Sequence, residues 1–436
     1  MNKHHRWLET EVERWVGGGI ISREQGAAIR GLYAAPANQV PWGLIVFFGI
    51  GAVVLGLGVI LLLAYNWEDL SKGVKLGLVL GGVAVAHAAG VMQARAGGWR
   101  VRLGEALSLL GTMLFGAGIW LVAQIYHIEE HFPNGFLFWA LGALAMAWAL
   151  QSVSHGVLAA VLIAIWGLAE TLGFDWRVDW ALLLLTAGVG PLTWRKRSAL
   201  LASALLASLY LLLLANAAHW AGGAAAFAAA FSLSAVLLAL AKLAEVREEI
   251  RGLRRVLRFF GIAGWLVCSY IGGFHGAVDD LLRWSSEPRD GGWAAVIHHG
   301  AWFGAALILW AWVALKVKRG ERGVRTEEWL CPLALVYAQL AAFAGEALDA
   351  RFVSVVFNLV ALCVASAWMV RGCREQRLRP VVLGSVLLSL VVFARYFDLF
   401  ESLAVRGMVF IGLGAVLFAE GFFYRRARGA MEAGEA

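Results

Sequence analysis

The side chains with the clearest catalytic spacing lie in one short segment. Residues 127–131 read HIEEH, which is the H-x-x-E-H spacing of one class of metallopeptidase. On a helix, His127 and His131 would share one face and could bind zinc, with Glu130 beside them. The PNG triplet at 133–135 follows at once and ends any such helix. A polar interfacial loop is therefore the favoured interpretation, and a metal-dependent enzyme on the outer face is the alternative.

A second set of polar side chains lies within the apolar stretches. Ionisable groups inside a membrane are costly and are functional candidates by default. His87 is the clearest ionisable case, and Thr112, Gln339 and Asn358 are the uncharged groups at mid-depth. Hydrogen bonding between helices is the favoured interpretation of these four residues, and a polar substrate pocket is the alternative. The sequence places no carboxylate at mid-depth, which argues against proton or sodium coupling.

Further acidic residues lie near the outer ends of apolar stretches. Glu170 and Glu346 are of this kind, and with His127, Glu130 and His131 they form a possible outer-face cluster. The four cysteines include no CxxC pair, so we expect neither a disulfide nor a structural zinc site. Nucleotide-binding, haem and nucleophile-elbow motifs are absent from the sequence, and we predict no cofactor and no catalytic residue.

The composition indicates which kind of scaffold must position these residues. The chain has 436 residues, of which 61% are hydrophobic and 15% are charged, and it contains 51 glycines. A soluble protein of this size could not bury so much apolar surface in one core. The composition also excludes disorder, collagen and a disulfide scaffold. We therefore predict an all-α, polytopic bundle of transmembrane helices.

Apolar stretches of about 20 residues, the length that crosses a bilayer, recur along the whole chain. We count about fourteen of them. They lie near 42–65, 73–94, 103–125, 134–150, 156–174, 178–194, 199–215, 219–241, 257–277, 293–315, 329–348, 352–370, 380–397 and 403–424.

The basic residues predict the orientation of these spans. With fourteen spans, 29 of the 37 lysines and arginines fall on the side that holds both termini. The positive-inside rule then places both termini in the cytoplasm. The net charge of +7 is explained by these short clusters and their contact with anionic lipid headgroups, so we expect no nucleic-acid partner.

The first 41 residues predict a cytoplasmic helical hairpin. Trp7 and Trp15 recur at helical spacing, and Ser22 and Gln25 have the spacing of a capping box at the start of a second helix. A hairpin this small cannot bury both tryptophans, so we expect them to dock on the membrane, on the membrane domain or on a partner protein. The predicted organisation is a hairpin at 1–41, a glycine-rich four-span unit at 42–150, a ten-span domain at 151–424 and a cytoplasmic tail at 425–436.

The longest outer connection contains a further amphipathic pattern. Residues 278–284 read VDDLLRW, which predicts a short helix lying on the membrane surface.

Several phrases of the sequence resemble a known bacterial family. They are GGGIISREQ, AYNWEDLSKGVKLGL, AQIYHIEEHFPNGFLFWALGALAMAW and, near the end, ARYFDLFESLAVRGMVFIGLGAVLF. These phrases are similar to the family known as domain of unknown function 2157, over roughly residues 5–150 and 390–425. The resemblance implies a multi-spanning protein of the bacterial inner membrane. It also implies a second membrane protein of the GDYXXLXY type as partner, and it carries over no catalytic residues.

Three functions remain in view. The favoured one is a non-enzymatic component of a membrane complex, with Trp7 and Trp15 as partner-binding residues. The alternatives are a transporter or flippase for a small or amphiphilic substrate, and the outer-face metal enzyme. The sequence does not indicate an oligomeric state.

Overall fold

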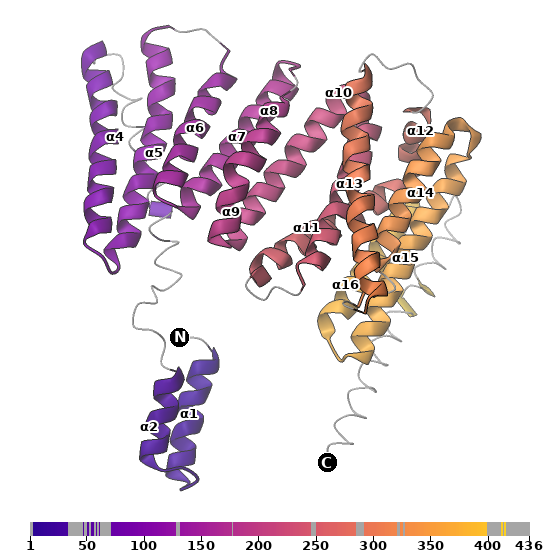
Figure 1. Cartoon of the computed structure of the whole chain (residues 1–436), viewed down its shortest axis with the longest axis horizontal. Coiled ribbons are helices and arrows are strands. Elements are labelled where there is room, and N and C mark those ends of the chain that lie inside the picture. Colours follow the sequence, from indigo (N-terminus) through magenta and orange to yellow (C-terminus); the bar gives the residue numbers. More distant parts are fainter. Residues whose placement is uncertain are drawn as a thin grey trace. The chain divides into compact units, whose positions relative to one another are not determined.

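The computed structural model consists of helices (Figure 1). It describes residues 3–33, 71–127, 131–176, 178–245, 250–284, 292–320, 323–325 and 328–398, with single positions between 47 and 61 and between 411 and 415. The described residues form no strand, which confirms the all-α prediction. The predicted first and last spans and the tail at 425–436 lie largely outside the described residues.

Two compact units divide the chain, residues 1–129 and 130–436, which we call unit 1 and unit 2.

Unit 1 begins with the predicted hairpin, formed by α1 (Lys3–Gly17) and α2 (Arg23–Tyr33). The capping box is confirmed, because Ser22 Oγ accepts from the backbone N–H of Gln25 at 3.1 Å and Gln25 Oε1 accepts from that of Ser22 at 2.9 Å. Val12 is fully buried, and a Cβ at Gly26 would lie 2.8 Å from Val16 Cγ2. The missing side chain at Gly26 therefore lets the two helices pack closely.

The other helices of unit 1 are α4 (Lys72–Arg95) and α5 (Arg100–Ile125), which pack along each other. Their contact depends on glycine. A Cβ at Gly104 would lie 2.5 Å from the carbonyl oxygen of Gly90, so the two backbones nearly touch. Small residues permit such close approach in membrane helices, where packing takes the place of the hydrophobic effect.

Unit 2 begins with an antiparallel pair, α6 (Pro133–Ala149) and α7 (Val153–Gly173). The next predicted span is broken into α8 (Asp179–Leu183), a π-helical turn η1 (Leu184–Val189) and α9 (Gly190–Lys196). The indole N–H of Trp148 donates to the carbonyl of Gly188 within the π turn at 2.9 Å. A helix turn with i→i+5 bonding leaves such carbonyls open to side-chain donors.

Helix α10 (Ala199–Leu243) is 45 residues long and doubles back on itself. Tyr210 and Ser234 are 24 residues apart, which a straight helix would separate by about 36 Å. Their hydroxyl oxygens lie 3.0 Å apart, so the chain must reverse between them. The two arms correspond to the two spans predicted at 199–215 and 219–241.

The remaining helices are α11 (Arg251–Gly272), α12 (His275–Trp284), α13 (Gly292–Lys318), α14 (Leu330–Ala344), the 3-10 turn η4 (Gly345–Ala347), α15 (Ala350–Arg374) and α16 (Leu378–Asp398). Among them, α11, α12, α13 and α14 pack against α10, α15 packs against α11, and α16 packs against α15 (Figure 1). Phe231 and Phe357, both fully buried, pack against each other with their rings tilted by 45°.

Helix α12 forms where the sequence predicted it, but its apolar face is buried inside the protein. Val278, Leu281 and Leu282 are at most 3% exposed, and the helix packs against α14 and α15. The expected placement on the membrane surface is therefore wrong, because the pattern of an amphipathic helix does not distinguish a lipid surface from a protein surface.

Eight helical segments among the described residues are long and apolar enough to cross a membrane. They are Lys72–Arg95, Arg100–Ile125, Val153–Gly173, Ala199–His219, Ala225–Leu243, Arg251–Gly272, Gly300–Lys318 and Ala350–Arg374. Two shorter apolar helices, Leu330–Ala342 and Leu378–Phe393, accompany them. The chain is thus a helical protein with several candidate spans, and the count of fourteen stays a prediction.

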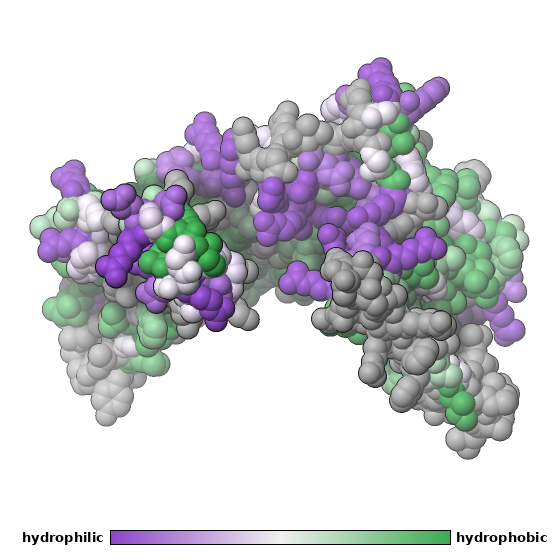
Figure 2. Space-filling view, turned by 90° about the horizontal axis from the view of Figure 1, so that it is seen from below, coloured by the Kyte–Doolittle hydropathy of each residue, from purple (hydrophilic) through white to green (hydrophobic). Residues whose placement is uncertain are grey.

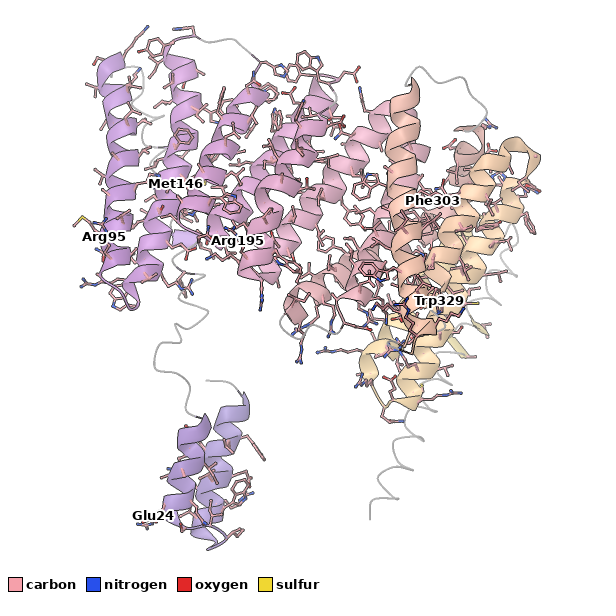
Figure 3. The ribbon with its side chains drawn as sticks, viewed as in Figure 1. Glu24, Arg95, Met146, Arg195, Phe303 and Trp329 are labelled. Atoms are coloured by element: carbon pink, nitrogen blue, oxygen red, sulfur yellow. The ribbon has the colours of Figure 1, made fainter. Side chains whose placement is uncertain are left out.

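The basic residues of unit 2 gather at one of its two ends. The end that holds the last turn of α9 and the first turns of α11 and α16 is rich in arginine, and we call it the basic end. Its described basic residues are Arg195, Lys196, Arg197, Lys242, Arg251, Arg254, Arg255, Arg258, Lys316, Lys318, Arg319, Arg325, Arg371, Arg374, Arg377 and Arg379. Arg195 and Trp329 mark this end in Figure 3.

Candidate functional site

A cavity of about 750 Å³ lies at the basic end of unit 2, among α10, α11, α13, α14, α15 and α16. We call it the basic-end cavity. Its apolar lining comprises Leu238, Ala241, Phe259, Ile262, Ala263, Trp265, Leu266, Trp310, Cys331, Val364, Trp368, Pro380 and Leu383. Its charged lining comprises Lys242, Glu245, Arg254, Arg255, Arg258, Glu328, Arg371 and Arg379.

The apolar wall of this cavity reaches the surface of the protein. Phe259 on α11 is 67% exposed and Leu383 on α16 is 55% exposed, although both line the cavity. Both helices are apolar segments of the kind that crosses a membrane or lies within one. Exposed aromatic and aliphatic side chains on such helices are suited to contact lipid. The apolar wall of the basic-end cavity therefore includes side chains that are exposed on the surface of unit 2.

The charged wall is partly neutralised by two glutamates. Glu328 lies between two cations, with Lys242 Nζ at 2.7 Å and Arg258 Nη2 at 3.6 Å. Glu245 also pairs with Lys242, at 3.1 Å, and its backbone carbonyl accepts from Arg254. Six basic and two acidic side chains line the cavity, so a formal excess of four positive charges remains. Hydrophilic side chains gather across unit 2 when it is seen from this end (Figure 2).

Helix α11 supplies three of the six basic side chains that line the cavity, because its basic residues are gathered at its start. Its first two turns carry Arg251, Arg254, Arg255 and Arg258, and the apolar run that follows enters the helix bundle. No acidic residue stands in its first turn. Cations at a helix N-terminus oppose the helix dipole, so these arginines cost helix stability unless an anion lies nearby.

Of the mid-depth residues, His87 and Thr112 lie in unit 1 and form contacts between and within helices. His87 Nδ1 lies 3.2 Å from Ser108 Oγ, which joins α4 to α5. Thr112 Oγ1 donates to the backbone carbonyl of Ser108 at 3.2 Å. A Cβ at Gly111 would lie 2.8 Å from the His87 ring, so the imidazole fills a gap left by glycine. These contacts are those of a packed helix pair.

Gln339 and Asn358 lie in unit 2, and neither lines the basic-end cavity. The amide of Asn358 on α15 donates to the carbonyl of Gly273 at 3.2 Å and to that of Ser354 at 2.8 Å. Gln339 is half-buried on α14. Asn358 thus ties α15 to the end of α11, which is a structural contact.

The outer-face residues include one close pair. His131 Nε2 lies 2.5 Å from Glu170 Oε2, and Glu170 Oε1 accepts from the indole N–H of Trp166 at 3.0 Å. Glu170 is 3% exposed, and the rings of Phe174 and Trp176 pack on His131. The pair joins the segment before α6 to the end of α7. Both residues belong to the outer-face cluster predicted from the sequence, although their separation of 39 residues carries no pattern that predicts the contact itself.

The H-x-x-E-H segment does not lie on one helix. Helix α5 ends at Ile125, His127 has a φ of 53°, and α6 begins at Pro133. Glu130 lies outside the described residues, as does the side chain of Glu346 in η4. No group of three or more potential metal ligands occurs among the residues that the structure describes. The zinc hypothesis therefore has no support from the described geometry.

The tryptophans of the hairpin differ in exposure. Trp7 on α1 is 59% exposed, whereas Trp15 is partly buried in the hairpin. Ile20, in the turn that follows α1, is 73% exposed. The hairpin thus presents apolar side chains that it cannot cover itself.

Comparison with known proteins bears on this amino-terminal part. Residues 13–156 match the family of predicted membrane proteins DUF2157. We call these residues the DUF2157 region. No curated protein and no solved structure matches the chain.

The family match over residues 13–156 confirms the resemblance seen in the sequence. It places this part of the chain among predicted membrane proteins. It includes His87, Thr112 and the H-x-x-E-H segment but ends before every residue that lines the basic-end cavity. The similarity of residues 390–425 to the same family stays a prediction. The cavity therefore belongs to the part of the chain outside the DUF2157 region.

Proposed function

We propose that this protein binds an amphiphilic molecule drawn from the membrane and carries it as a transporter or flippase. The observation that supports this proposal is the basic-end cavity, whose wall is apolar and exposed on one side and charged on the other. An apolar chain fits the side formed by Phe259 and Leu383, and a polar headgroup fits the charged side. Pockets of several hundred Å³, mainly apolar with a few convergent polar groups, are typical of ligand sites.

A cavity-filling variant tests the proposal. Ala263 lines the cavity on α11, and Ala263→Trp introduces an indole into that space. Ala301→Trp adds the same side chain at an exposed position of α13 outside the lining and serves as the matched control.

The readouts are native mass spectrometry of lipid retained after extraction into nanodiscs and transfer of a labelled lipid between leaflets of proteoliposomes. We expect Ala263→Trp to lose retained lipid and transfer, and Ala301→Trp to keep both. Equal retention and equal transfer by the two variants would exclude the cavity as the amphiphile site.

The proposed location is the bacterial inner membrane, with the basic end on the cytoplasmic side. Support comes from the gathering of arginine and lysine at one end of unit 2 and from the positive-inside rule. The basic-end cavity would then open toward the cytoplasmic leaflet.

A second candidate function is a non-enzymatic component of a membrane complex, with a second inner-membrane protein as partner. It is supported by the hairpin, on which Trp7 and Ile20 are highly exposed. Aromatic anchors of this kind often carry the binding energy of protein interfaces.

Tagged full-length protein, purified gently from its native host, tests this candidate. We expect one membrane protein to co-purify in stoichiometric amount, and Trp7→Ala to release it. Glu9→Ala, which removes a side chain from the same helix without removing an aromatic anchor, is expected to retain it. Recovery of the chain alone would contradict this function.

A further inference from the structure

The cations that line the basic-end cavity are not all matched by the protein. Lys242 and Arg258 share Glu328, whereas Arg255 on α11 and Arg379 on α16 have no ion pair in the described part of the chain. Arg255 and Arg379 come from different helices but line the same cavity. Two exposed guanidinium groups converging on one space form a site for an anion.

The backbone adds to this positive field. Helices α11 and α16 both begin beside the cavity, with Arg255 and Arg379 in their opening turns, and neither has an acidic residue in its first turn. Helix N-termini carry partial positive charge and unpaired N–H groups, which attract anions. The arginine side chains and the two helix N-termini therefore both favour a negatively charged ligand.

A buried donor is a separate sign of an oxygen-rich ligand. Trp265 lines the cavity from α11, is 4% exposed, and its indole nitrogen has no acceptor among the described residues. Trp310 lines the same cavity, but its indole donates to the carbonyl of Ala235 at 3.0 Å. Buried donors are nearly always satisfied, so this indole N–H, unpaired within the described part of the chain, is suited to an acceptor on a bound ligand.

We infer that the amphiphile carries a phosphate headgroup of net negative charge, held by Arg255 and Arg379, with its apolar chain against Phe259 and Leu383. This inference rests on the proposed amphiphile site. Guanidinium groups bind phosphate in a bidentate manner, and the phosphate oxygens or the adjoining ester carbonyl provide acceptors for Trp265. Glu328 already neutralises the neighbouring cations, so the two unpaired arginines set the position of the headgroup.

The test uses full-length protein in nanodiscs and native mass spectrometry of retained lipid. The probes are phosphatidylglycerol, zwitterionic phosphatidylcholine, the carboxylate oleate, and soluble glycerol phosphate. Wild type is expected to retain phosphatidylglycerol on the order of 10-fold more than phosphatidylcholine or oleate. The double variant Arg255→Gln/Arg379→Gln is expected to lose this preference.

Two further variants separate lost binding from lost folding. Arg255→Lys/Arg379→Lys keeps both charges and is expected to restore the preference for an anion in part. Arg195→Gln/Arg377→Gln removes two charges from the same end but outside the cavity lining, and is expected to retain the preference in full.

Each other outcome contradicts a distinct part of the inference. If phosphatidylcholine, which also carries a phosphate, is retained as well as phosphatidylglycerol, while Ala263→Trp displaces both, the amphiphile site stands and the net negative charge of the headgroup is wrong. If oleate is retained as well as phosphatidylglycerol, the phosphate is wrong. If glycerol phosphate competes as well as the lipid does, the phosphate comes from a soluble source and the lipid is wrong. If Ala263→Trp displaces nothing, the proposed function itself fails.

Discussion

At the scale of single residues, two buried serines on α10 can be compared directly. Ser232 and Ser234 are both fully buried, but Ser232 Oγ has no partner among the described residues. Ser234 Oγ donates to the carbonyl of Ala230 at 2.6 Å and lies 3.0 Å from Tyr210 OH. Only Ser234 therefore links the two arms of α10.

We predict that Ser234→Ala lowers the free energy of unfolding by about 1 kcal/mol, a typical value for a hydrogen bond between membrane helices. Ser232→Ala is expected to be neutral or slightly stabilising, since it removes an unsatisfied buried hydroxyl. Unfolding of both variants in mixed micelles measures the difference. A larger loss in Ser232→Ala would show that its hydroxyl has a partner after all.

Glu328 provides the second prediction at this scale. Its carboxylate pairs with Lys242 and Arg258 and so lowers the positive charge of the wall on which Arg255 and Arg379 would hold the phosphate. Glu328→Gln is expected to raise the retention of phosphatidylglycerol by roughly three- to tenfold, because the charged wall becomes more positive. Glu375→Gln, which removes the partner of Arg377 outside the cavity, is the control and should change nothing. Reduced retention in Glu328→Gln would mean that Glu328 holds the cations in place for the ligand instead of lowering the positive charge of the wall.

At the scale of helices, the packing of α4 on α5 depends on individual glycines. Gly104 faces the carbonyl of Gly90, whereas a Cβ at Gly81 on α4 would meet nothing within 4 Å. Gly104→Ala should therefore destabilise unit 1 by about 1–3 kcal/mol through overpacking. Gly81→Ala should be neutral or stabilise the helix, because alanine loses less backbone freedom on folding. Thermal unfolding in detergent compares the two, and equal melting temperatures would contradict the close contact.

The sequence predicted most of these helices because apolar length and hydrophobic composition are local properties. It predicted the two arms of α10 as separate spans, and it predicted α12 as a helix but misplaced its apolar face. The π turn within 184–189 could not be foreseen, since its carbonyl at Gly188 is satisfied by Trp148, a residue 40 positions away. Contacts at that separation leave no pattern within a single stretch of sequence.

The basic-end cavity could not be predicted from the sequence for the same reason. Arg254, Arg255 and Arg258 were interpreted as a marker of orientation, which is what basic residues beside a span usually indicate. Nothing in the sequence shows that Arg371 and Arg379, more than 100 residues later, line the same space. Residues such as His87 and Asn358 were selected because polar side chains are rare at mid-depth. The structure gives both of them hydrogen-bond partners within the protein.

At the scale of the whole molecule, the charges predict a sidedness that labelling can measure. Asp175 is 90% exposed on its side chain and lies at the end opposite Arg377. In a chain whose four native cysteines are replaced, Asp175→Cys should react with an impermeant maleimide from outside intact cells. Arg377→Cys should react only after the cells are opened. Labelling of both from the same side would contradict the proposed topology.

The exposure of Phe259 and Leu383 has a consequence for how occupancy of the cavity is controlled. A site that opens into the hydrocarbon takes its ligand from the plane of the membrane. Its occupancy then depends on the mole fraction of that lipid in one leaflet. Diluting the cells or the sample would leave occupancy unchanged, whereas altering the proportion of anionic lipid would change it. The protein would then respond to the composition of the membrane around it and not to any solute in the water on either side.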